Sequence, residues 1–309
     1  MQKWWRSASP VRFSPPAILA TMNLRHALVA TLLVTTPLFA QSTANPPAAT
    51  QQMILPSHGS NLLGVFYLAA GAGPHPTAIV FHGFPGFEQN LDLAQYLRAH
   101  GWNVLAMHYR GSWGVKGNFS FEHAAEDADS QVSFLLNPDN AQKYRIDTHR
   151  IVVIGHSMGG YMAASAIAHN PQVAAAVLIS AWNISRGFKN RRRPGEAPVT
   201  VKEEAEAIGL DNNLAPLAGT SGLALAREIQ DHRQALNFLS LAPAIAPRPV
   251  FIITASEGLA PTDHALAEAI TKAGDTHVTE RHWDTDHSYS GQRAELAAAI
   301  LQWASNLPR

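Results

Sequence analysis

Residues 151–160 read Ile-Val-Val-Ile-Gly-His-Ser-Met-Gly-Gly, and this run constrains the fold more than any other part of the chain. Its four β-branched residues predict a short buried strand, and the helical pattern of Tyr161–His169 follows directly. Between them lies a Gly-x-Ser-x-Gly turn, in which a Cβ on Gly155 or Gly159 would collide with the neighbouring strand or helix. A serine on so sharp a turn exposes its Oγ at the edge of a sheet. We therefore predict that Ser157 is a nucleophile.

Short apolar runs alternate with helical patterns along most of the chain. This alternation predicts an α/β fold with a mostly parallel central sheet and helices on both of its faces. A hairpin is expected first, from Gln52–Leu55 to Leu62–Leu68. Further strands are expected at Thr77–His82, Val104–Tyr109, Ile151–Gly155, Ala174–Ser180, Val250–Thr254 and His277–Arg281. Helices are expected at Leu91–His100, Phe121–Leu136, Met158–His169, Asp263–Ala273 and Gln292–Asn306.

The interval of residues 183–246 interrupts this alternation between two predicted strands. A connection of this length is usually a functional excursion in a compact domain. It holds helical patterns near Val201–Ile208 and Leu223–Phe238, and we predict that it forms a helical cap over the substrate pocket. Its basic cluster, with Lys189 and residues 191–193, is expected to be a solvated face of the cap.

A neutral serine needs a base within hydrogen-bond reach, and that base needs an acid to orient it. His287 has the best context of the 15 histidines, because it lies between the last predicted strand and the C-terminal helix. Glu257 comes immediately after the Val250–Thr254 strand and is the predicted acid. Asp263 is the alternative, although its position at a helix start suits a carboxylate that complements the helix dipole.

The reaction also needs two donors for the oxyanion of a tetrahedral intermediate. The loop after the Thr77–His82 strand supplies the Phe84 N–H, and the start of the helix after Ser157 supplies the Met158 N–H. Trp113 and Trp182 are weaker candidates for residues that line the substrate pocket.

These motifs together resemble those of the α/β-hydrolase superfamily. The shared features are Gly155-His156-Ser157-Met158-Gly159-Gly160, the His82-Gly83-Phe84 loop, Glu257 and Asp286-His287 in the order serine, acid, histidine. The resemblance covers residues 52–306 and is closest to the branch of serine esterases and prolyl-oligopeptidase catalytic domains. One departure is that the usual Gly-x-x-Asp-x-x-x-Pro acid motif stands here as Ala255-Ser256-Glu257-Gly258-Leu259-Ala260-Pro261.

The resemblance implies a serine hydrolase that cleaves small carboxylic esters. A prolyl-oligopeptidase-like peptidase or amidase with a short acyl or peptidyl substrate is the first alternative. A binding protein on an inactive hydrolase scaffold is the second. The chain has no cysteine and no His-Glu-x-x-His motif, so we expect neither a metal nor another cofactor. The 23 basic residues equal the 23 acidic ones, so no nucleic-acid partner is expected.

Residues 1–44 have the pattern of a leader, and we expect translation to begin at Met22. The apolar run of Ala27–Phe39 is shorter than the ~20 residues of a membrane-spanning helix, which favours a cleaved signal peptide over an anchor. We therefore predict export to the periplasm or the exterior, with an uncleaved membrane anchor as the alternative. Residues 45–51 are expected to form a linker and residues 52–309 the folded domain.

Overall fold

The computed structural model describes residues 45–189, 198–274 and 277–308. The predicted leader and the arginines at 191–193 lie outside these residues. Within the described residues, the longest apolar helices fall short of what a membrane crossing requires.

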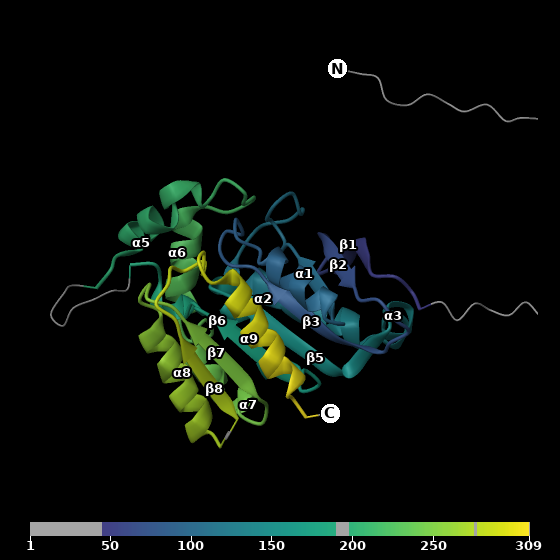
Figure 1. The fold of residues 1–309 in the computed structure, drawn as a ribbon. Coiled ribbons are helices and arrows are strands. Elements are labelled where there is room, and N and C mark those ends of the chain that lie inside the picture. Colours follow the sequence, from purple (N-terminus) through teal and green to yellow (C-terminus); the bar gives the residue numbers. More distant parts are fainter. Residues whose placement is uncertain (1–44, 190–197, 275–276, 309) are drawn as a thin grey trace, which may run out of the picture. The chain divides into compact units, whose positions relative to one another are not determined.

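The described residues form an eight-stranded sheet with the order β1-β2-β4-β3-β5-β6-β7-β8 (Figure 1). β2 runs antiparallel to both of its neighbours, and the strands from β4 across to β8 are parallel. The mostly parallel sheet predicted from the sequence is therefore confirmed. The bounds are β1 Ala49–Ser57, β2 Ser60–Leu68, β3 His75–Phe81, β4 Asn103–Met107, β5 Ile146–His156, β6 Ala175–Ile179, β7 Val250–Thr254 and β8 Val278–His282.

Helices cover both faces of this sheet, as predicted. One face packs against α1 and α9, and their apolar stripes bury Leu97 and Ile300 against strand residues such as Val152. The other face packs against α2, α4 and α8, where Val132, Met162 and Ile270 share one core with Val153. The helix bounds are α1 Leu91–Ala99, α2 Phe121–Leu136, α3 Pro138–Tyr144, α4 Met158–His169, α7 Ala242–Ile245, α8 Ala260–Lys272 and α9 Arg293–Ser305.

The interval between β6 and β7 carries α5 (Val201–Ile208) and α6 (Gly222–Asp231), which pack against each other. It begins with the short 3-10 helix η1 (Ile184–Arg186), and α6 contacts η1. Figure 1 shows α5 and α6 beyond the end of the sheet at which β6 and β7 finish.

Three elements differ from the sequence predictions. β1 begins at Ala49, so the predicted linker is shorter than residues 45–51. α6 ends at Asp231 rather than Phe238, and the chain after it is held by bonds from other segments: Ala235 accepts from the Tyr161 hydroxyl and Leu236 from the Ser185 N–H. α3 was not predicted, although the Asn137 side chain caps its first N–H groups.

Candidate active site

Ser157 lies on the sharp turn between β5 and α4, in a backbone conformation that few non-glycine residues adopt. Its φ is 58° and its ψ is −120°. A Cβ on Gly155 would lie 1.8 Å from the Gly159 carbonyl oxygen, and one on Gly159 would lie 2.0 Å from the Phe81 oxygen. The turn therefore forms only with glycine at both positions. Strain of this kind costs about 1–3 kcal/mol and is typical of functional sites.

The backbone of Ser157 is fixed on both sides. Its N–H donates to the Ile179 oxygen at 2.9 Å, and its own carbonyl accepts the Trp182 N–H at 2.8 Å. The side chain lines a pocket of about 570 Å³, which we call the catalytic pocket. Because the hydroxyl bonds to no other described residue, it can rotate within this pocket.

The structure brings His287 and Glu257 to the same pocket from two different loops. Glu257 follows β7 and His287 follows β8. The His287 Nδ1 lies 3.6 Å from the Glu257 Oε1. Burial acts to raise the pKa of Glu257, but bonds from His287 and Ser180 outweigh it and lower that pKa below the ordinary value. Glu257 is thus a carboxylate that faces the imidazole, as the predicted acid should.

Asp263, the alternative acid, is placed elsewhere. It is fully buried on α8, and its Oδ2 accepts the Ala181 N–H at 3.0 Å. Burial raises the pKa of Asp263 well above its ordinary value, so the neutral form is favoured. This side chain fixes the segment after β6 and does not contact His287.

The loop after β3 lies directly against Ser157. A Cβ on Gly83 would come within 3.1 Å of the Ser157 Cβ and 3.6 Å of its Oγ. Phe84 lines the catalytic pocket, and its N–H donates to no other described residue. The Met158 N–H is at the first position of α4, where it has no partner inside the helix. Neither of the two predicted oxyanion donors therefore has a hydrogen-bond partner among the described residues.

Two buried contacts hold this loop in place. The His82 Nδ1 bonds to the Gly83 carbonyl at 2.8 Å, and burial lowers the pKa of His82 to about 3. The Trp113 indole donates to the Pro85 carbonyl at 2.8 Å. Trp113 does not line the catalytic pocket, contrary to our expectation, and its ring packs instead against Phe87 and His108.

His156 has a structural role that the sequence did not reveal. Its Nε2 donates to the His287 carbonyl at 2.8 Å, and the two rings lie 4.6 Å apart. Burial lowers the pKa of His156 to about 3, and the nearby His287 lowers it further. A neutral imidazole behind the nucleophile therefore positions the His287 loop. Its place in the Gly-His-Ser-Met-Gly run was the only signal for it.

Aromatic side chains form one wall of the catalytic pocket. Trp182 lines it, as expected, together with Phe84 and Phe188. The Phe188 ring lies 4.5 Å from that of Trp182 and 5.5 Å from that of Phe84. Such a wall suits an apolar or aromatic part of a ligand. Among the described residues, no group of three or more potential ligand side chains gathers as a metal site would require.

A model of the Alpha/beta hydrolase family matches residues 78–299, which include every residue placed in this site. The chain belongs to that family. An esterase of Pyrococcus furiosus shares its fold, with a TM-score of 0.59 and 17% identity over 86% of this chain and 98% of the esterase. An esterase of Pyrobaculum calidifontis has a TM-score of 0.59 and 18% identity over 84% of this chain and 86% of its own. An acylaminoacyl peptidase of Pyrococcus horikoshii has a TM-score of 0.60 and 16% identity over 84% of this chain and 42% of its own.

Curated relatives match over a shorter stretch. Cutinase 2 of Thermobifida cellulosilytica is 21% identical over 133 residues, which are 42% of this chain and 49% of the relative. Cutinase cut1 of Thermobifida fusca has the same identity over 42% of this chain and 40% of its own length. The chain thus spans half or less of the length of these relatives.

Proposed function

We propose that this chain is a serine hydrolase that cleaves carboxylic ester bonds through an acyl-enzyme on Ser157. The observation that carries the proposal is the convergence of three elements on one pocket: the strained Ser157 turn, the His287–Glu257 pair and the Gly83 loop. The esterases and cutinases among its relatives support an ester substrate.

The first half of the reaction forms the acyl-enzyme. His287 accepts the Ser157 proton while Oγ attacks the acyl carbon, and Glu257 holds the Nδ1–H tautomer and stabilises the imidazolium that forms. The Phe84 and Met158 N–H groups bind the oxyanion of the tetrahedral intermediate. One such donor contributes about 3–4 kcal/mol to the transition state. His287 then donates its proton to the departing alkoxide.

The second half returns the enzyme to its starting state. His287 accepts a proton from water, and the hydroxide formed attacks the acyl carbon. The same two N–H groups bind the second oxyanion, and Ser157 leaves as the alcohol with the proton that His287 held. No cofactor is needed for either half.

The test is the hydrolysis of neutral 4-nitrophenyl esters of graded acyl length by the wild type and by Ser157→Ala. We expect kcat to fall by about 10⁶, because the nucleophile is lost while the fold remains. A fluorophosphonate probe should label the wild type on Ser157 and leave Ser157→Ala unlabelled. An aminoacyl 4-nitroanilide measured beside the esters separates the two enzyme classes. Faster turnover of the anilide, or wild-type protein that the probe does not label, would contradict the proposal.

A further inference from the structure

A second cavity adjoins the catalytic pocket. Its volume is about 1090 Å³, against about 570 Å³ for the catalytic pocket. We call it the cap cavity, because α5, α6 and the segments beside them form most of its wall, with the start of α8 opposite. Asn183, Arg186, Gly187, Pro261 and Thr262 line both spaces. A ligand held at Ser157 can therefore extend into the cap cavity.

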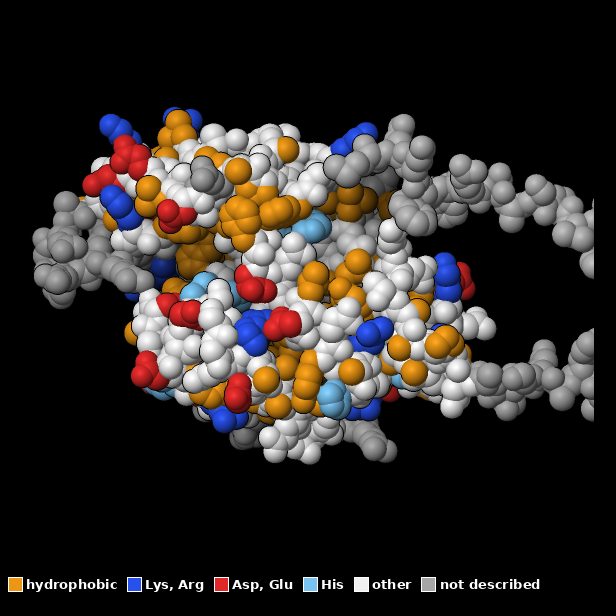
Figure 2. Space-filling view, turned by 45° about the horizontal axis from the view of Figure 1, so that its top comes forward, with side chains coloured by type: hydrophobic (Ala, Val, Ile, Leu, Met, Phe, Trp, Pro, Cys, Tyr) orange, Lys and Arg blue, Asp and Glu red, His pale blue; other side chains and the backbone are white. Residues whose placement is uncertain are grey.

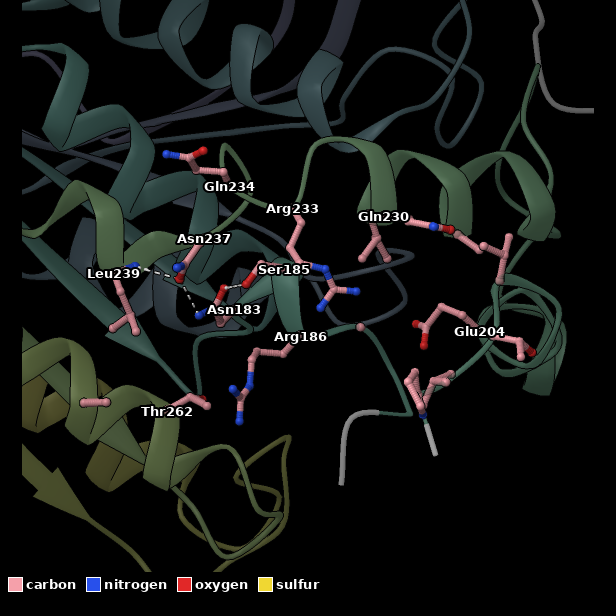
Figure 3. A pocket seen from close by; sticks show the side chains of 18 of the residues that line it. Asn183, Ser185, Arg186, Glu204, Gln230, Arg233, Gln234, Asn237, Leu239 and Thr262 are labelled. Atoms are coloured by element: carbon pink, nitrogen blue, oxygen red, sulfur yellow. Dashed lines mark hydrogen bonds between the residues drawn. The ribbon is translucent and has the colours of Figure 1, made fainter. Parts of the chain in front are cut away.

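Two guanidinium groups project into this space. Arg186 ends η1 and Arg233 follows α6, and Figure 3 shows both side chains extending into the opening between the cap helices and α8. Both are exposed, and neither forms an ion pair with a carboxylate among the described residues. A guanidinium binds a carboxylate through two parallel N–H bonds, and unpaired groups in one cavity remain available for such a ligand.

The one acidic residue among those that line the described cavity is already bonded. Glu204 is buried, and its carboxylate accepts the Phe188 N–H at 2.5 Å and the Lys189 N–H at 3.3 Å. It holds the backbone after η1 against α5 and is not paired with either arginine. Among the described residues that line the cavity, the charged side chains therefore carry a net positive charge.

The positive charge is local to this cavity. Figure 2 shows that Lys and Arg side chains are interspersed with Asp and Glu over the face of the described residues that it presents. Within the cavity, the Asn183 amide donates to the Asn237 side chain at 2.9 Å, so these two polar groups bind each other (Figure 3). The arginines are thus the groups best placed to select a ligand by its charge.

We propose that the substrate is an ester that carries a carboxylate some distance from the bond that is cleaved. Its apolar part contacts the wall of Trp182 and Phe188, and its carboxylate binds Arg186 and Arg233 in the cap cavity. This inference rests on the proposed function, because it assumes that the ester is held at Ser157.

The test compares charged esters with neutral counterparts of the same size. Mono-4-nitrophenyl suberate and its methyl ester place the charge on the acyl side. The octanoates of 4-hydroxybenzoic acid and of its methyl ester place it on the alcohol side. In one of these two pairs, the one whose charge reaches the cap cavity, we expect the wild type to favour the charged ester. Its kcat/KM should be at least about tenfold higher than that of the neutral ester, which is the effect of one charge-assisted hydrogen bond. The preference should shrink as salt is raised, because both arginines are exposed.

The double variant Arg186→Gln/Arg233→Gln should remove this preference, so that kcat/KM of each charged ester falls to that of its neutral counterpart measured with the same variant. Arg227→Gln is the matched control, since Arg227 is an exposed arginine of α6 that does not line the cavity. It removes one positive charge, half of what the double variant removes, so an effect of net charge alone would appear in it at about half the size. If it lowers the preference to that extent, long-range charge is the cause and the inference is wrong.

A binding measurement separates this inference from the proposed function. Calorimetric titration of Ser157→Ala with monoethyl suberate and diethyl suberate requires no turnover. We expect at least about tenfold tighter binding of the charged monoester, lost when the two arginines are also replaced. Equal binding of both compounds, or a preference that survives the arginine substitutions, overturns the inference even if neutral esters are hydrolysed. A preference for the charged compound without any hydrolysis would support the cavity and refute the esterase.

Discussion

The edge of the sheet around Ser157 and the insertion of residues 183–246 differ in how strictly the structure limits the residue types at each position. At the edge, backbone geometry decides which residues are allowed: Gly155 and Gly159 leave no room for a Cβ, and His156 is buried among its partners. In the insertion, Arg186 and Arg233 are exposed side chains that the fold does not require. This difference is what our two proposals require, in which the edge performs the chemistry and the insertion selects the substrate.

Strain at the edge strengthens this contrast. Ser157, Ser180 and Tyr289 all have positive φ angles, of 58°, 41° and 57°. The Ser180 and Tyr289 hydroxyls bond to each other at 2.9 Å, and Ser180 also helps to lower the pKa of Glu257. A strained backbone persists only where surrounding contacts determine it, so the backbone at these three positions is fixed by its surroundings.

The largest effect expected at the edge concerns its two carboxylates. Glu257→Gln should lower kcat by about 10³–10⁴, because an amide cannot stabilise the His287 imidazolium or hold its tautomer. Asp263→Asn should change kcat by less than about threefold, since an amide oxygen can still accept the Ala181 N–H and burial already favours a neutral carboxyl.

Steady-state kinetics of both variants on one neutral ester measures this difference, with unfolding curves to confirm that each is folded. A large loss for Asp263→Asn beside a small one for Glu257→Gln would assign the acid to Asp263. It would also show that the hydrogen bonds at this edge rearrange when substrate binds.

The residues at this edge could be predicted from the sequence because each of them is marked by a strand pattern directly before it. Ser157, the loop of Phe84, Glu257 and His287 each follow a strand directly, and in a parallel sheet all such ends meet at one edge. The fold class, the family and the placement of these residues could be inferred from that regularity. What could not be inferred was the function of His156, which depends on where the His287 carbonyl lies in space.

The insertion was predicted only in outline. The helical pattern predicted α5 correctly, and the structure adds a capping box of Thr200 and Glu203 at the start of this helix. The predicted helix ran past the end of α6 into a segment that bonds to Tyr161 and Ser185, and these contacts between residues distant along the chain leave no trace in the local sequence pattern. The cap cavity could not be predicted for the same reason. No sequence periodicity relates Arg186 to Arg233, and only the fold brings them to one cavity.

The pH dependence of stability is a second way to test the rigidity of the edge. The folded pKa of His156 is about 3, below the ordinary histidine value of about 6.5. Between these values the unfolded chain takes up a proton that the folded protein excludes. Stability from this group is therefore complete above pH 6.5 and is lost as the pH falls, on the order of 2 kcal/mol by pH 5.

His156→Phe keeps the ring and removes both the proton site and the bond to the His287 carbonyl. At pH 7.5 we expect this variant to be less stable by about 1–3 kcal/mol, because a buried acceptor loses its partner. At pH 5 the difference should shrink by about 2 kcal/mol. The unfolded wild type then binds a proton at His156 that the folded protein does not bind, which lowers the stability of the wild type, and the variant has no such group. Urea unfolding at both pH values measures it, and other titrating groups cancel in the comparison. A difference that does not change with pH would mean that His156 is not held neutral.

The smallest expected effect lies where the insertion meets the edge, at Phe188. Its ring packs on Trp182 and Phe84 at the wall of the catalytic pocket. Phe188→Ala should raise KM for an aromatic ester about fivefold and leave kcat within about twofold, because the wall contacts substrate and transition state alike.

Phe134→Ala is the matched control for this substitution. Phe134 is a half-buried ring that packs on Tyr144, away from the pocket, so its loss should lower stability without raising KM. If Phe188→Ala instead lowers kcat with KM unchanged, the ring supports the Phe84 loop during the reaction. The boundary between the residues that perform the chemistry and those that select the substrate would then lie inside the insertion rather than at the end of β6.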